Sequence, residues 1–170
     1  MGYSPQERLM TFEALQKLPD GYFDFIFSEE VFEHIEESEK MAHELYRIAR
    51  SNSLHVHTYP GTFAIMEEHV HLPFVHWLPK HRVRKFYMAP FIALGFHRGD
   101  DWGGKTVLGK TNTYYDYLDK KTYYRDIRDV LVLFESVGFR AKEELCQQYS
   151  NKLLRNGFPK HRMLLVLKKD

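Results

Sequence analysis

An apolar run that stops abruptly at a group of acids constrains the fold of this chain more than any other feature. Residues 22–27 read YFDFIF and lead directly into Ser28, Glu29 and Glu30. The turn residues Leu18-Pro19-Asp20-Gly21 precede the run and deliver the chain into it. A short, almost wholly apolar run of this kind predicts a strand that is buried on both faces, as in a parallel sheet.

A helix and a second strand follow at short distance. Apolar residues recur at helical spacing through residues 38–50, which predicts an amphipathic helix. Ser51-Asn52-Ser53 breaks that pattern, and residues 54–59 predict the second strand. A strand, a helix and a strand within about 40 residues form a right-handed crossover unit, so the fold class is α/β.

The remainder of the chain divides into an irregular middle and a regular end. Residues 60–121 are rich in Pro, Gly, His and aromatic residues and are expected to form an insertion or lid. Residues 124–137 predict another amphipathic helix, which Gly138 would close in a left-handed conformation. Residues 139–145 and 163–167 are expected to be the last strands, paired as a hairpin at the end of a mixed sheet.

Composition narrows the class of protein. A length of 170 residues and a mass of 20.3 kDa predict a single domain, 1–170. The net charge of +1 gives no electrostatic reason to expect a nucleic-acid partner. The single cysteine, Cys146, excludes an internal disulfide framework and fits a reducing compartment. With no long apolar run and no secretory signal, a cytoplasmic protein without a membrane span is expected.

Several short motifs occur in an order that points to a known family. FDFIFS at 23–28 runs into a V-x-E-H segment at 31–34, and a helix ending in ExxRIAR then leads to the strand LHVHTYP at 54–60. FESVGF follows at 134–139. This succession resembles the second half of a class I S-adenosylmethionine-dependent methyltransferase, most closely the methyltransferase type 11 subgroup. The resemblance implies a partial Rossmann-like sheet with helices on both faces, an irregular aromatic insertion, and S-adenosylmethionine as cofactor.

The resemblance lacks one part of the family pattern. The Gly-x-Gly-x-Gly cofactor loop and the acid after the second strand should both lie upstream of a segment such as FDFIFS. Only residues 1–22 precede that segment, too few for two strands, a helix and a glycine loop. The chain is therefore expected to be an incomplete methyltransferase domain, and whether it is an active enzyme by itself is left open.

The resemblance also implies four cofactor-binding residues. Ser28 and Glu29 follow the first predicted strand and would line the methionine part of the cofactor, where carboxylates stabilise the sulfonium and ammonium charges. Glu13 and Ala14 resemble the acid–alanine pair that meets the adenine. The alternatives are a solvated acidic loop at Ser28 and Glu29, whose charge favours the following helix dipole, and a plain surface turn at Glu13 and Ala14.

Histidines provide the candidate catalytic groups. His69 and His71 would face the methyl acceptor, where an imidazole can accept a proton near neutral pH. Polar loop histidines that satisfy backbone groups are the alternative. His55 and His57 alternate on one strand, and H-x-H with a carboxylate can form an iron site, but the pattern is weak and no third ligand is evident. No metal ligands are therefore predicted.

Two other motifs favour ordinary structural roles. Residues 99–106 match the phosphate-loop pattern G-x4-G-K-T, but two aspartates and Trp102 argue against phosphate binding there. The basic run 80–87 could steer an anionic acceptor or contact RNA, although a solvated helix face is the commoner explanation.

The sequence thus predicts a methyltransferase that uses S-adenosylmethionine and acts on a small-molecule or glycan/lipid-linked acceptor. A non-catalytic methyltransferase-like interaction protein is the first alternative, and a histidine-metal enzyme is the second.

Overall fold

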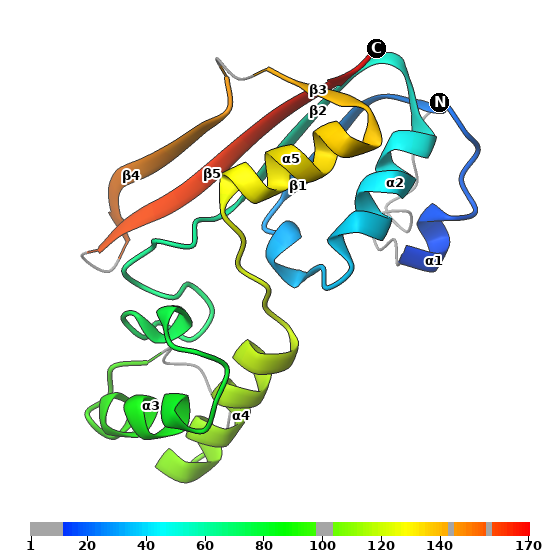
Figure 1. Cartoon of the computed structure of the whole chain (residues 1–170). Coiled ribbons are helices and arrows are strands. Elements are labelled where there is room, and N and C mark those ends of the chain that lie inside the picture. The colour runs from blue at the N-terminus through cyan, green and yellow to red at the C-terminus, as the bar shows by residue number, and fades with distance from the viewer. Residues whose placement is uncertain (1–11, 98–103, 143–144, 156–157) are drawn as a thin grey trace.

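A mixed sheet forms the centre of the computed structural model, which describes residues 12–97, 104–142, 145–155 and 158–170 (Figure 1). Its order is β1-β2-β5-β3, and β4 also pairs with β5. The strands are β1 Phe23–Glu29, β2 Ala49–Pro60, β3 Phe139–Ala141, β4 Gln147–Arg155 and β5 Phe158–Lys169. The helices are α1 Phe12–Leu15, α2 Ser38–Ile48, α3 Val83–Ala93, α4 Val107–Lys120 and α5 Ile127–Val137, with short 3-10 helices η2 Phe32–His34 and η3 Val75–Trp77.

The crossover unit β1–α2–β2 is present, and the predicted α/β class is confirmed. β1 and β2 are parallel, with Phe25 opposite Leu54 and Glu29 opposite Thr58. The helical pattern does end before residues 51–53, as expected, but β2 begins at Ala49, earlier than the residue 54 expected from the sequence. The polar residues are accommodated by a register shift in the pairing and a positive φ of 67° at Asn52.

Antiparallel strands complete the sheet. β5 pairs with β2, and β3 pairs with β5 from Phe139 to Ala141, as expected for the two final strands. The expected strand 139–145 ends early, however, and the hairpin partner of β5 is β4, a strand that the sequence did not predict. β3 and β4 therefore both pair with β5, whereas β2 pairs with it from the other side.

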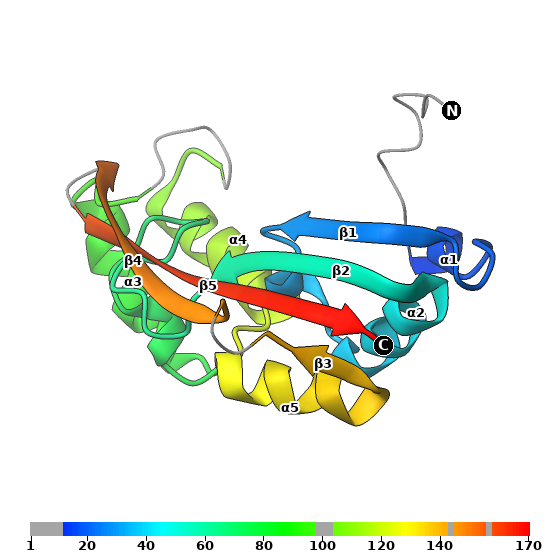
Figure 2. The same cartoon turned by 90° about the horizontal axis from the view of Figure 1, so that it is seen from above.

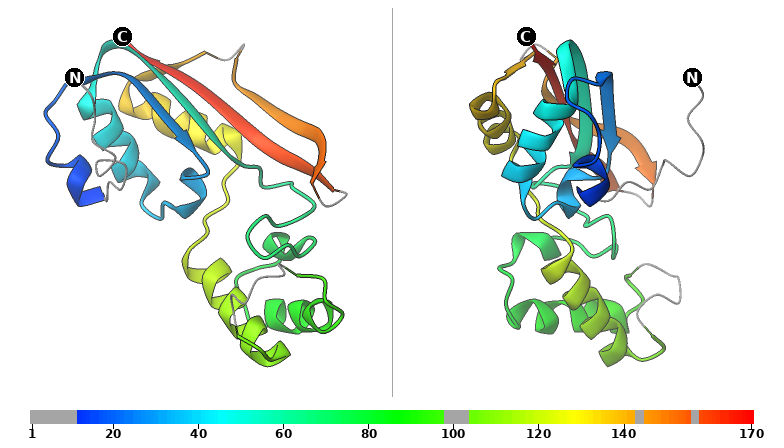
Figure 3. Two further views of the ribbon diagram at one scale, coloured as in Figure 1. Left: turned by 180° about the vertical axis from the view of Figure 1, so that it is seen from behind. Right: turned by 90° about the vertical axis from the view of Figure 1, so that its right-hand side faces the viewer.

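One face of the sheet holds the main core. In Figures 2 and 3, α2 and α5 lie together on this face. Gly138 ends α5 with a φ of 113°, which confirms the predicted left-handed cap. His55 and His57 of β2 point into the same core and are fully buried. The buried apolar residues are Phe32, Ala42, Leu45, Ile48, Tyr59, Val130, Phe134, Phe139, Met163, Leu165 and Leu167.

The opposite face is open among the described residues. Phe25 and Phe27 of β1 are 55% and 56% exposed, and Leu54 beside them is 39% exposed. The expectation that this strand is buried on both faces is therefore wrong, because β1 is an edge strand whose second face has no helix over it in the described ranges. Of the helices expected on both faces, the described chain shows those of one face.

Residues 60–121 are more regular than the expected insertion. Helices α3 and α4 pack together beyond the end of the sheet, and we call them with η3 the helical unit (Figures 1 and 3). A second core packs these helices against the loop before η3, and it consists of Val70, Leu72, Val75, Met88, Ile92, Tyr114 and Leu118. The basic run 80–87 enters α3 but is not a uniformly solvated face, because Arg84 is 3% exposed. Most of the phosphate-loop-like tract lies outside the described residues.

Candidate functional site

The carboxyl ends of β1 and β2 meet at the edge of the sheet where ligands bind in open α/β folds. Ser28 and Glu29 end β1 there, and the chain then turns through η2, which places Glu33 and His34 at the same edge. Glu30 takes a positive φ of 54° at the turn and forms an ion pair with Arg162 of β5.

The two cofactor candidates at the end of β1 differ in environment. The Ser28 hydroxyl lies 2.7 Å from His57 Nδ1 on the core side of the sheet. Burial, and then the neighbouring His55, lower the pKa of His57 to about 3, so the ring is neutral and its hydrogen bond to Ser28 is structural. Glu29 is exposed and its carboxylate can meet a ligand.

The other two cofactor candidates lie elsewhere. Glu13 and Ala14 belong to α1, which lies near the start of β1, at the end opposite to Glu29 (Figure 2). An Arg47 Nη2 hydrogen bond of 3.0 Å to the Leu15 carbonyl ties this segment to the last turn of α2. The structure therefore does not bring Glu13 and Ala14 together with Ser28 and Glu29.

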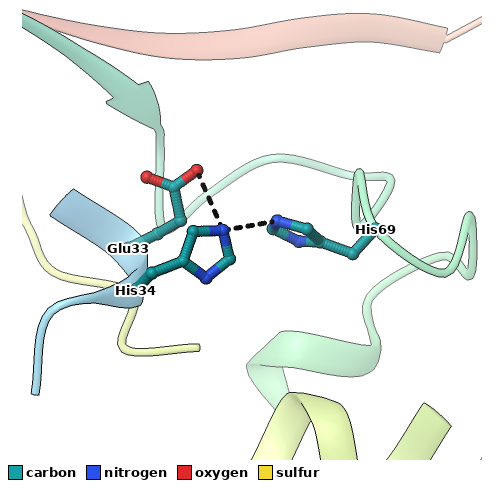
Figure 4. A group of neighbouring side chains, drawn as sticks. All are labelled: Glu33, His34 and His69. Carbon is teal, nitrogen blue, oxygen red and sulfur yellow. Dashed lines mark hydrogen bonds and ion pairs between the residues drawn. The ribbon is translucent and has the colours of Figure 1, made fainter. Parts of the chain in front are cut away.

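Three side chains converge just beyond the sheet edge (Figure 4). Glu33 and His34 come from η2, and His69 comes from the loop that leads into the helical unit. The Nε2 atoms of His34 and His69 are 3.2 Å apart, and His34 Nε2 lies 3.9 Å from Glu33 Oε1. One nitrogen or oxygen from each residue falls within 4.8 Å of the others, and we call this set the Glu33–His34–His69 cluster.

A buried carboxylate fixes His69. The Nδ1 atom of His69 donates to Glu67 Oε1 at 2.6 Å. The Glu67 side chain also accepts hydrogen bonds from the Val70 amide at 2.7 Å and from the Tyr124 hydroxyl. Burial opposes ionisation of Glu67, but these hydrogen bonds hold its pKa below the ordinary value. Burial likewise opposes a charge on His69, yet the hydrogen bond and the charge of Glu67 raise the pKa of His69.

Glu33 is the least satisfied group of the cluster. It is 1% exposed, and neither carboxylate oxygen accepts a hydrogen bond from another described residue. Burial raises its pKa to about 7. A buried carboxylate without donors is costly, because polar groups in the protein interior normally have partners.

The helical unit forms a wall of this site. The ring of Tyr117, from α4, lies 5.4 Å from the His69 ring and 6.2 Å from the His34 ring. A pocket of about 430 Å³ adjoins it, lined by His76, Tyr123, Tyr124, Arg125 and neighbouring residues.

Sequence reasoning found one histidine of this site and missed the rest. His69 lies in the cluster, whereas His71 lies outside it, in a turn with a φ of 56°. In the sequence, His34 stands out only as part of the V-x-E-H segment at 31–34, and nothing marks Tyr124 as a partner of Glu67. The acid–histidine pair directly after a strand end was the signal that could have indicated His34.

Comparisons with known proteins agree with this fold. A model of the "Methyltransferase domain" family matches residues 3–56. A SAM-dependent methyltransferase structure from Methanosarcina mazei superimposes with a TM-score of 0.53 at 13% identity, covering 90% of this chain and 62% of that one. One from Mesorhizobium loti gives 0.53 at 12% identity, covering 91% and 67%. No curated protein sequence matches the chain significantly.

These matches bear on different parts of the chain. The family model covers β1, α2 and the first part of β2, and the structural matches extend over most of the chain. In the described ranges, no helix has the length and apolar character needed to cross a membrane. The chain spans 62% of the Methanosarcina structure and 67% of the Mesorhizobium one. The resemblance seen in the sequence is confirmed: the fold is that of class I S-adenosylmethionine-dependent methyltransferases.

Proposed function

We propose that this chain serves S-adenosylmethionine-dependent methyl transfer to a small-molecule or glycan/lipid-linked acceptor. The match of the methyltransferase family model to the β1–α2–β2 crossover is the observation that most directly supports this function. The same crossover ends β1 at Glu29, on the carboxyl edge of the sheet, and the chain continues from there into η2, which carries Glu33 and His34.

The chemistry requires orientation and one proton acceptor. In methyl transfer, the acceptor atom forms a bond to the methyl carbon as the bond from that carbon to the sulfonium sulfur breaks, and S-adenosylhomocysteine leaves. An exposed carboxylate such as Glu29 would stabilise the positively charged donor before transfer. This chain's task is then to hold both reactants in line and keep water out.

His69 is the group best placed to take the acceptor's proton. Its Nδ1–H is committed to Glu67, which leaves Nε2 as the basic atom and fixes the ring orientation. The helical unit would cover the acceptor as a lid, with the pocket beside Tyr124 as its binding space.

Titration calorimetry with S-adenosylhomocysteine tests the proposal. We expect binding to this chain, or to a version extended upstream, and a several-fold weaker affinity for Glu29→Gln because one attractive charge is lost. Glu39→Gln, which removes an exposed carboxylate from the first turn of α2, is the matched control and should bind as the parent does. Absence of heat from both the chain and its extended version would overturn the proposal.

A non-catalytic interaction protein is the second candidate. The exposed phenylalanines Phe25 and Phe27 on the edge strand favour it, because contiguous apolar surface commonly marks an interaction site. This candidate predicts no binding of S-adenosylhomocysteine by either version of the chain.

A further inference from the structure

The two histidines of the cluster face each other with Nε2 atoms that cannot form a hydrogen bond when both rings are neutral. His34 Nδ1 lies 2.7 Å from the Lys121 carbonyl oxygen, which can only accept, so this nitrogen carries the proton. His69 Nδ1 lies 2.6 Å from the Glu67 carboxylate and donates to it. In neutral rings both Nε2 atoms are then lone-pair acceptors, yet they lie 3.2 Å apart. Two lone pairs at this distance repel unless a cation lies between them.

In the part of the chain that the structure describes, the Glu33 carboxylate beside them also lacks a contacting cation or hydrogen-bond donor. Glu33 points toward His34 Nε2 in Figure 4 and is withdrawn from solvent, with both oxygens lacking a hydrogen bond from another described residue. The nearest charges that act on Glu33 include Arg162, but its Nη2 is engaged by Glu30 and Glu68 rather than by Glu33. A carboxylate oxygen and two nitrogen lone pairs therefore lie within 4.8 Å of one another.

We propose that Glu33 Oε1, His34 Nε2 and His69 Nε2 bind a divalent transition-metal ion. Two imidazoles and a carboxylate suit Zn²⁺, Fe²⁺ or Mn²⁺. Three protein ligands leave at least one coordination position for water or for an oxygen of another molecule.

The distances and the surroundings fit such an ion. Nitrogen ligands about 2.0–2.1 Å from a tetrahedral ion lie about 3.3 Å apart, close to the 3.2 Å between the two Nε2 atoms. Glu33 Oε1, at 3.9 Å from His34 Nε2, needs to approach by only about 0.6 Å to match that spacing. Metal-bound histidines usually donate their second nitrogen to a carboxylate or a backbone carbonyl, as His69 and His34 both do here.

Metal binding goes beyond the proposed methyl transfer and does not depend on it. An ion would occupy His69 Nε2, the atom that acts as the proton acceptor in the metal-free protein. The metal-bound and metal-free forms would therefore activate an acceptor differently, and metal binding can be measured without cofactor or acceptor.

The test uses the full chain, purified without a histidine tag, stripped with a chelator and titrated separately with Zn²⁺, Mn²⁺ and, anaerobically, Fe²⁺. We expect one equivalent of at least one metal to bind, measured by elemental analysis after gel filtration and by competition with a chromophoric chelator. Glu33→Gln and His69→Gln should each weaken this binding at least tenfold. Glu67→Gln, which changes the positioning of His69 rather than a ligand, should weaken it by about 10–100-fold.

His43→Gln is the matched control, because His43 is an exposed histidine of α2 that does not belong to the cluster. It should keep the parent affinity, and circular dichroism should show all variants folded. The visible spectrum of bound Co²⁺ provides a second readout that reports nitrogen and oxygen ligation directly. Failure of all three metals to bind stoichiometrically would overturn the proposal, with a proton shared by the two Nε2 atoms as the remaining explanation. The proposal would also be overturned if His43→Gln weakened metal binding as much as His69→Gln does.

Discussion

The two faces of the sheet are built from the same strands but have opposite surroundings. On the covered face, β2 places His55, His57 and Tyr59 beneath α2 and α5, and all three are buried. On the open face, Phe25 and Phe27 of β1 are more than half exposed. Large aromatic groups therefore lie in solvent, whereas ionisable rings lie in the core, the reverse of what side-chain hydrophobicity alone would give.

The difference shows that packing partners, rather than strand composition, decide burial here. Residues alternate between the faces of a strand, so each β2 histidine lies beneath the helices because of its position in the register. Their burial is tolerable because neutral imidazoles pack against rings, as His57 does at 5.9 Å from Phe134. The open face has the composition of a covered one, but no described helix lies over it.

The largest contrast is expected from matched phenylalanine truncations on the two faces. Phe134→Ala removes a fully buried ring that contacts the rings of Phe32, His57 and Phe139, and should lower the free energy of unfolding by about 3–5 kcal/mol. Phe27→Ala should cost less than about 1 kcal/mol, because its ring is already hydrated. Urea denaturation measures both values. Equal losses would show that the second face is covered in solution.

The buried histidines predict a pH dependence that belongs to the covered face. Burial lowers the pKa of His57 to about 3 and that of His55 to about 4, below the ordinary value near 6.5. Folding therefore favours the neutral rings, and their stabilisation is complete above about pH 6.5 and lost as the pH falls toward those values. Between pH 7 and pH 5 the parent should lose about 2 kcal/mol more than His57→Gln does.

Denaturation at a series of pH values gives that difference directly. Thr58→Ala, one position along β2 and on the other face, is the control and should retain the pH dependence of the parent. A His57→Gln variant with the same pH dependence as the parent would contradict buried neutrality of this ring.

The close packing of the two covering helices predicts a smaller effect. Gly138 ends α5 at a φ of 113°, and a Cβ there would lie 3.1 Å from the Tyr46 ring of α2. Gly95 also has a positive φ, 81°, but a Cβ there would meet nothing within 4 Å. Gly138→Ala should therefore lower the free energy of unfolding by about 1 kcal/mol more than Gly95→Ala does. The Gly95 substitution only places alanine at a positive φ, without a close contact. Equal losses would show that Tyr46 moves aside freely.

Local periodicity predicted the parts of the fold that depend on local signals. The apolar spacing of residues 38–50 and the glycine at 138 correctly indicated α2 and the end of α5. The edge position of β1 could not be predicted in this way, because an apolar run reads the same whether helices lie over one face or both. Similarly, Arg84 appeared to be part of a solvated basic run, but tertiary packing buries it.

The site was only partly predictable for a related reason. His34 and His69 are far apart in sequence, and they meet because the loop after β2 folds back over η2. The same fold decides which of two adjacent carboxylates contacts His69. Glu67 is buried and accepts a hydrogen bond from His69, whereas Glu68 forms an ion pair with Arg162. A row of neighbouring acids and histidines does not show which of them will face one another.

The smallest expected effect concerns the open face itself. Phe25→Lys places a charge on that face and should change the free energy of unfolding by no more than about 0.5 kcal/mol, since the side chain is 55% exposed. It should nevertheless reduce the fluorescence of a bound hydrophobic dye, because the contiguous surface around Phe25, Phe27 and Leu54 is interrupted. Leu94→Lys is the control: Leu94 is 74% exposed at the end of α3, away from this surface, and the dye signal should stay unchanged. A destabilisation of several kcal/mol by Phe25→Lys would mean that the open face is packed against a partner in solution. The two faces would then differ in what covers them, and not in whether they are covered.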